Sequence, residues 1–239
     1  MTALTSLEPS QLTAMAVAGE TVLDSMRVLG RTGDTIVGEV LKGGGDFKVW
    51  SHYPNSDVID PNTHCQFYYH AHPRAQRPGE HGHFHLFIRP EGIPKSIKPV
   101  KMGRGNRLRD FDNPMCHLVA VSMNSRSLPI ALFATNRWVT NDPWYDAEST
   151  IQLMDRFMMD TAHPSWPVNR WISAMVKLFR PDIAALLRER DERLAAYRRR
   201  NPTGDFFSNH RIEIISYRTI SLKRQVRDIR RAIHRLECN

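Results

Sequence analysis

The strongest constraint on the fold of this chain is a two-residue alternation of histidine between positions 70 and 85. His70 and His72 form one H-x-H pair, and His81, His83 and His85 form a longer series. Side chains on a β-strand point alternately to its two faces, so a series with this period places its histidines on one face. The pattern predicts two β-strands joined by the loop at residues 73–80, which contains the proline and glycine typical of turns.

The length of this loop suits a somewhat extended hairpin connection, in which the two strands pair directly. We expect three directly opposed pairs: His72 with His81, His70 with His83, and Tyr68 with His85. Directly opposed Cβ atoms lie about 4.5–5.5 Å apart. Imidazoles that close can share one metal ion, because metal–nitrogen bonds are about 2.0–2.1 Å long for zinc.

The density of imidazoles on one face favours a bound cation. Several protonated rings would repel one another, and burying them charged would be costly, whereas a divalent ion holds them neutral. Imidazole ligands suit zinc, copper and iron. The sequence therefore predicts one divalent transition-metal ion (Fe, Cu or Zn), with heme as a weaker alternative. The candidate ligands are His70, His72, His81, His83 and His85.

A three-histidine site with an open position can activate water or oxygen against a small-molecule substrate. Glu80 is the nearest carboxylate. Because it is adjacent to His81, we expect its side chain to face away from the histidines unless the hairpin bends there, and so to support a histidine ligand or act as a general base instead of binding the ion. Tyr68 is a second candidate catalytic residue. Three side chains are candidates for substrate binding: Gln66, Arg137 and Trp138. His52 and His117 are candidates for a further ligand if their strands neighbour the hairpin.

Two known metal sites share part of this spacing. The H-x-H pair of His83 and His85, with His70 from the neighbouring strand, looks like the carbonic anhydrase arrangement. His70-Ala71-His72 followed by Glu80 is similar to the metal motif of cupins, although seven residues intervene before the acid. The resemblance covers the metal geometry only and implies neither fold nor activity.

The rest of the chain predicts an α+β fold in one domain spanning residues 1–239, with a mostly antiparallel sheet between helices. Apolar residues at helical spacing predict an N-terminal helix over residues 8–29. A sheet region follows over 47–140 and a helical region over 146–236. The expected strands are Phe47–His52, His64–His72, His81–Arg89, Cys116–Met123 and Pro129–Thr140, with Arg211–Tyr217 as a further candidate. The expected later helices are Ala147–Met159, Val168–Phe179, Pro181–Arg199 and Ser221–Leu236, and Pro90–Pro114 is expected to be a long loop.

Composition narrows the class of protein. The chain has 239 residues and 41% hydrophobic residues, which is enough to build a core. No apolar stretch approaches the ~20 residues of a membrane-spanning helix, and the first ten residues do not resemble a secretory signal. Three scattered cysteines do not form a disulfide framework. We therefore expect a cytoplasmic protein that does not enter a membrane.

The net charge of +8 is concentrated near the C-terminus. Residues 1–176 contain 17 basic and 17 acidic side chains, whereas residues 177–239 contain 16 basic and 8 acidic ones. The last predicted helix has a narrow apolar seam, which favours packing on the body of the protein, with a homodimer as the alternative. Its arginines surround the helix, so nucleic-acid binding is the least favoured function. A protein that only stores or carries a metal is the main alternative to an enzyme.

Overall fold

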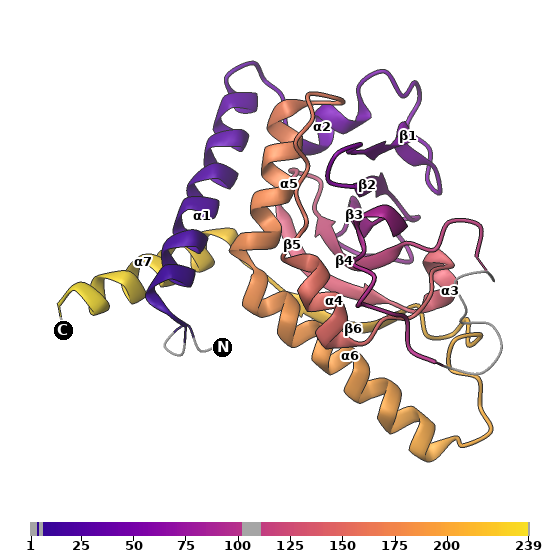
Figure 1. Ribbon diagram of the computed structural model, residues 1–239. Helices are drawn as coiled ribbons and strands as arrows, with labels where there is room; N and C mark the ends of the chain where they lie inside the picture. The colour runs from indigo at the N-terminus through magenta and orange to yellow at the C-terminus, as the bar shows by residue number, and fades with distance from the viewer. Residues whose placement is uncertain (1–3, 5–6, 102–110, 239) are drawn as a thin grey trace.

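The computed structural model describes residues 4, 7–101 and 111–238. It has the predicted α+β architecture, in which one antiparallel sheet is accompanied by helices from both ends of the chain (Figure 1). The sheet has six strands in the order β1-β2-β3-β4-β5-β6, so every strand pairs with its neighbours in sequence. The strands are β1 (His52–Ile59), β2 (Cys65–His70), β3 (Gly82–Ile88), β4 (Cys116–Met123), β5 (Pro129–Thr135) and β6 (Ile214–Thr219).

The helices agree with the apolar periodicity of the sequence, except that the helix predicted over Ala147–Met159 ends at Met154. The N-terminal helix α1 spans Pro9–Gly30, where Pro9 occupies the first turn, a position that needs no backbone N–H. The other helices are α2 (Ile36–Leu41), α3 (Arg137–Thr140), α4 (Ala147–Met154), α5 (Trp166–Leu178), α6 (Arg180–Arg200) and α7 (Leu222–Glu237). A short 3-10 helix, η2 (Pro90–Gly92), begins the predicted loop, of which residues 102–110 lie outside the described part of the chain.

One face of the sheet forms the main hydrophobic core together with the helices. Phe84 of β3 contacts Trp171 of α5, with ring centres 5.6 Å apart, and both side chains are fully buried. Alternate residues of the other strands, among them Phe67 and Leu132, belong to the same core. Helix α1 lies beside α5, and both stand on one side of the sheet (Figure 1). We call this side of the sheet the helical face.

Two predicted strands differ most from the structure in their bounds. The prediction of Phe47–His52 is wrong, because β1 begins at His52 and continues to Ile59 through Pro54. A proline is tolerated there because β1 is an edge strand, and the pairing of β1 with β2 is irregular between Tyr53 and Val58. The predicted strand Pro129–Thr140 is too long. Asn136 ends it by capping α3, since its side chain accepts a hydrogen bond from the Arg137 N–H.

Helix α7 packs against α1 through its apolar seam. Ile229 and Ala232 are buried, and Gly19 of α1 allows close approach, since a Cβ at Gly19 would lie 3.2 Å from Val226 Cγ2. In the described part of the chain no helix is both long and apolar enough to span a bilayer.

Candidate metal centre

The hairpin of β2 and β3 has the predicted register at two of the three expected pairs. His70 lies opposite His83, and Tyr68 lies opposite His85. Strand alternation directs these four side chains away from the helical face, on which Tyr69 and Phe84 meet with ring centres 4.9 Å apart. We call the opposite side of the sheet, which carries these four residues, the histidine face.

Three imidazoles on the histidine face lie in mutual contact. The ring centres are 4.9 Å apart for His70 and His72, 5.5 Å for His70 and His83, and 5.4 Å for His72 and His83. With metal–nitrogen bonds of about 2.0–2.1 Å in a tetrahedral site, the centres of two imidazole ligands lie roughly 5 Å apart. The spacing of these three rings therefore matches that of imidazoles sharing one ion.

Glu80 holds His83 in a defined orientation. Its Oε1 lies 2.8 Å from His83 Nδ1, and its Oε2 accepts a short hydrogen bond from the Ser122 hydroxyl. His83 Nε2, on the other side of the ring, is buried and has no hydrogen-bond partner. Histidine ligands of metals commonly donate their second ring N–H to a carboxylate. Glu80 and His83 have this arrangement, and His70 Nδ1 is a second buried ring nitrogen without a partner.

Burial keeps the His70 and His83 rings neutral at physiological pH, because it lowers the pKa of both. Desolvation, reinforced by His83 and His72, lowers the pKa of His70 to about 3. Desolvation also lowers the pKa of His83, although the Glu80 carboxylate opposes this shift. For Glu80 itself burial acts to raise the pKa, but the hydrogen bond and charge of His83 and the hydrogen bond from Ser122 outweigh it and lower that pKa. Neutral rings offer lone pairs to a metal, and an ionised Glu80 suits the support of His83 better than proton transfer.

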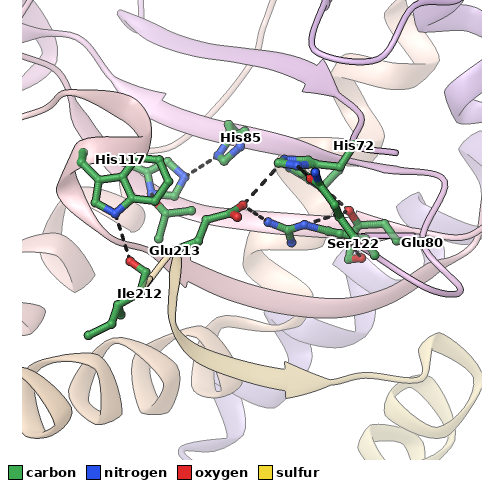
Figure 2. Close-up of polar contacts among 12 residues, drawn as sticks. His72, Glu80, His85, His117, Ser122, Ile212 and Glu213 are labelled. Atoms are coloured by element: carbon green, nitrogen blue, oxygen red, sulfur yellow. Dashed lines mark hydrogen bonds and ion pairs between the residues drawn. The ribbon is translucent and has the colours of Figure 1, made fainter. Parts of the chain in front are cut away.

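Glu213, from the segment before β6, connects His72 to Arg77. Its Oε1 lies 3.7 Å from His72 Nε2 and accepts a short bond from Arg77 Nη2 (Figure 2). The Arg77 Nε lies 3.8 Å from Glu80 Oε1. The charge of Arg77 is thus shared between two carboxylates, each of which contacts a different histidine.

A second chain of polar contacts leads away from the three rings. His85 Nδ1 lies 3.0 Å from His117 Nε2, and His117 Nδ1 lies 3.3 Å from the Thr135 hydroxyl (Figure 2). Desolvation lowers the pKa of His85 well below its usual range and that of His117 to about 3. His85 contacts His83 with ring centres 4.7 Å apart, so this chain begins beside the three rings.

His81 does not share the face of His83 and His85, and that prediction is wrong. Its Nδ1 lies 2.7 Å from the Tyr69 hydroxyl, on the helical face. The physical reason is that β2 ends at His70 and β3 begins only at Gly82, so strand alternation does not extend to His81 or His72. The expected pairing of His72 with His81 is therefore absent from the register of the described strands.

The remaining candidates occupy different surroundings. Gln66 is buried, and its amide is engaged on both sides, donating to Asp57 Oδ2 and accepting from Arg89 Nη1. Tyr68 stacks on His52 with ring centres 3.7 Å apart, and burial raises the pKa of its phenol, which therefore stays protonated. Both lie on the histidine face with His52 at its edge.

Arg137 and Trp138, the other candidates for substrate binding, lie beyond His117. Arg137 lines a small cavity with His117 and Asp142 and places its guanidinium 5.0 Å from the ring centre of Phe207. Trp138 donates its indole N–H to the Ile212 carbonyl. Neither residue lines the cavity that adjoins His72.

That cavity opens beside the three rings and has a volume of about 660 Å³. His72, Glu80, His81 and Arg74 contribute to its wall, together with the apolar side chains of Phe47 and Val49. Its size is within the range of small-molecule sites. The hydrogen-bonded carboxylate and one of the three contacting imidazoles therefore both face a space that a small ligand can enter.

The ring orientations are those of a hydrogen-bonded network. Within residues 4, 7–101 and 111–238, no group of three or more histidine, cysteine, aspartate or glutamate side chains has an arrangement that could hold a metal ion. His72 Nδ1, for example, lies 3.3 Å from the Gln76 side-chain oxygen. Metal binding at this position would require the rings to turn about their side-chain bonds.

A family model described as "Domain of unknown function (DUF6969)" matches residues 16–220. The chain belongs to this family. The matched segment contains the whole sheet and the histidine face, and it ends just before α7. No curated protein matches this DUF6969 chain. No solved structure matches it either.

Sequence reasoning missed Arg77, Ser122 and Glu213. Ser122 had a usable signal, since a polar residue in the apolar strand Cys116–Met123 indicates a specific partner. Arg77 lies in the hairpin loop, and its partner Glu213 is 136 residues away in sequence, so no local pattern connects them.

Proposed function

We propose that this protein is a metal-dependent enzyme in which His70, His72 and His83 hold one transition-metal ion. The observation that carries the proposal is the buried, unpartnered His83 Nε2, on a ring whose other nitrogen is bonded to Glu80. A buried polar atom without a partner is costly unless something binds it. The lowered pKa values of His70 and His83 and the spacing of the three rings support the same ligand set.

The cavity of about 660 Å³ beside His72 favours an enzyme over a protein that only stores metal. A storage site has no need for a space of that size next to its ligands, whereas a catalytic site keeps one position open for water or substrate. The cavity wall combines Arg74 and Glu80 with apolar side chains, so it can orient a small polar molecule. In this proposal the ion activates water or oxygen against that molecule, and Glu80 orients His83.

The first experiment is elemental analysis of protein purified without a histidine tag. We expect close to one Fe, Cu or Zn per chain, retained after dialysis. His83→Ala and His70→Ala should each lose the metal while keeping the circular dichroism of the parent. His234→Ala is the control, because His234 is exposed on α7 and far from the hairpin in sequence. Equal metal content in His83→Ala and the parent protein would reject the ligand set.

The second experiment separates an enzyme from a storage protein. Protein loaded with Co²⁺ is titrated with azide, and the visible absorption spectrum is recorded. An open coordination position predicts a new absorption band that saturates with azide. A spectrum that azide leaves unchanged would mean a closed site and would favour the storage function.

A further inference from the structure

A groove of about 890 Å³ lies between α1, the turn from β4 to β5, and α7. It is separate from the histidine face, because none of the histidines of that face lines it. Apolar residues line much of it, and we call them its floor: Leu23, Met26, Leu128, Pro129, Ile130, Ile220, Leu222 and Val226. The groove is therefore an apolar site that the proposed function does not use.

The apolar residues of the floor are recessed. Only Leu23 and Leu128, at 40% and 37% exposure, are among the exposed large hydrophobic side chains, and Ile220 is buried. A surface that docks on a membrane or a partner helix presents projecting apolar residues to it. A recessed floor instead suits a slender hydrocarbon chain that enters the groove.

Basic side chains of α7 line one side of the groove. Helix α7 contains six lysine and arginine residues and two acidic ones, which gives a net charge of +4. Arg227 pairs with Asp228, whereas Lys223, Arg230 and Arg231 have no carboxylate partner in the described part of the chain. Unpaired cations beside an apolar floor attract a ligand that combines an anionic head with an apolar tail.

We propose that this groove binds an anion with a single long hydrocarbon chain, of the long-chain carboxylate class. The hydrocarbon chain of the ligand lies on the apolar floor, and its head group pairs with Arg230 and Arg231. A second copy of the protein is a poor occupant, because it would bring two helices of charge +4 together. The volume of the groove is also of the size that encloses a small ligand.

The test is isothermal titration calorimetry with dodecanoate below its micelle concentration, using the full chain. We expect one site per chain, and no measurable binding of butyrate, which has the same head group and no long chain. Leu23→Asp should weaken dodecanoate binding at least tenfold by placing a carboxylate on the floor. Val28→Asp is the matched control, because Val28 is on the same helix with 41% exposure and does not line the groove.

The head-group contact is tested by a second matched pair on α7. Arg231→Glu should weaken dodecanoate binding about fivefold, the effect of one partly exposed ion pair. Arg235→Glu, which makes the same charge change outside the groove, should leave the affinity unchanged. Because both changes are on the surface, thermal unfolding should be the same for the two variants.

Several outcomes would overturn the proposal. They are binding of butyrate as tight as that of dodecanoate, equal weakening by Leu23→Asp and Val28→Asp, or equal weakening by the two arginine changes. Binding to vesicles of anionic phospholipid without binding of monomeric dodecanoate would instead assign the groove to a membrane surface. None of these results depends on the metal content of the protein.

Discussion

The two faces of the β2–β3 hairpin come from the same residues in alternation, yet they differ in chemistry. On the helical face, Phe84 and Leu86 are fully buried in the main core. On the histidine face, His83 and His85 are almost equally buried, at 1% and 2% exposure, but they lie among polar groups. Burial therefore has a different consequence on each side.

On the helical face, burial removes apolar surface from water and stabilises the fold. On the histidine face, burial removes hydration from imidazoles and lowers their pKa values, which costs free energy unless partners compensate. The comparison indicates that the helical face provides stability, whereas in the proposed function the histidine face serves the metal site.

The largest effect is expected from Phe84→Ala on the helical face. Phe84 is fully buried against Tyr69, Phe67 and Trp171, so its removal leaves a cavity in the main core. The free energy of unfolding should fall by about 3–5 kcal/mol, measured by urea denaturation. Phe47→Ala is the control and should cost under about 1 kcal/mol, because Phe47 is 44% exposed. Equal losses of unfolding free energy in the two variants would show that the helical face is not the main source of stability.

The next largest effect is a pH dependence of the unfolding free energy that arises from Asp142, which lines the small cavity with His117. Burial raises its pKa to about 8, and its Oδ2 has no hydrogen-bond partner. Between pH 3.8, the ordinary pKa of an aspartate, and about pH 8, the folded state holds a proton that the unfolded state has released. Stability therefore falls as pH rises through this window, by at most about 1.4 kcal/mol per pH unit.

Asp142→Asn removes this dependence because the amide does not ionise. The difference in unfolding free energy between parent and variant should change steadily from pH 5 to pH 8, with the parent losing stability relative to the variant. Taking the difference cancels the titration of the other groups. Asp24→Asn, an exposed position on α1, should give a difference that does not vary with pH. If the unfolding free energies of the parent and Asp142→Asn change in parallel from pH 5 to pH 8, the Asp142 carboxyl is ionised over the whole range and the prediction is wrong.

A smaller effect is expected from Glu80→Gln, which keeps the shape of the side chain and removes its charge. If Glu80 orients and polarises His83, metal affinity should fall about 10–100-fold, measured by competition with a chromophoric chelator. Glu91→Gln should leave the affinity unchanged, since Glu91 is exposed and pairs only at 3.9 Å with Arg89. An unchanged metal affinity in Glu80→Gln would show that Glu80 does not support metal binding by His83.

The sequence predicted the hairpin well because local rules determine it. The alternation from His83 to Leu86 favours a strand, and the pairing of His70 with His83 is one of the pairs expected for two strands joined directly by the loop. The same rules fail where regular structure ends, as at His81, whose side chain is placed by Tyr69 on the other face. The β1 strand was missed because Pro54 argues against a strand unless its position at an edge is known.

The residues that support the site could not be predicted from the sequence, because tertiary structure brings them to it. Glu213 reaches His72 and Arg77 from a segment before β6, and that contact exists only once β5 and β6 pair. Arg137 and Trp138 were candidates for substrate binding because the sequence placed them near the end of a strand. In the structure Asn136 caps α3, so both residues are in a short helix instead. Composition identifies such side chains as capable of binding, whereas only packing determines which cavity they line.

The smallest effect is expected from His85→Leu, which tests whether the histidine face contributes to stability at all. Leucine is similar in size and apolar, so it relieves the desolvation cost that lowers the pKa of His85. It also leaves His117 Nε2 without its partner. These contributions oppose each other, and the unfolding free energy should change by less than about 1 kcal/mol. The reciprocal change, Leu86→His, places an imidazole in the main hydrophobic core, to which the fully buried Leu86 belongs, and should cost at least about 2 kcal/mol. If His85→Leu proves as costly as Leu86→His, the buried imidazoles stabilise the fold, and the division of roles between the two faces is wrong.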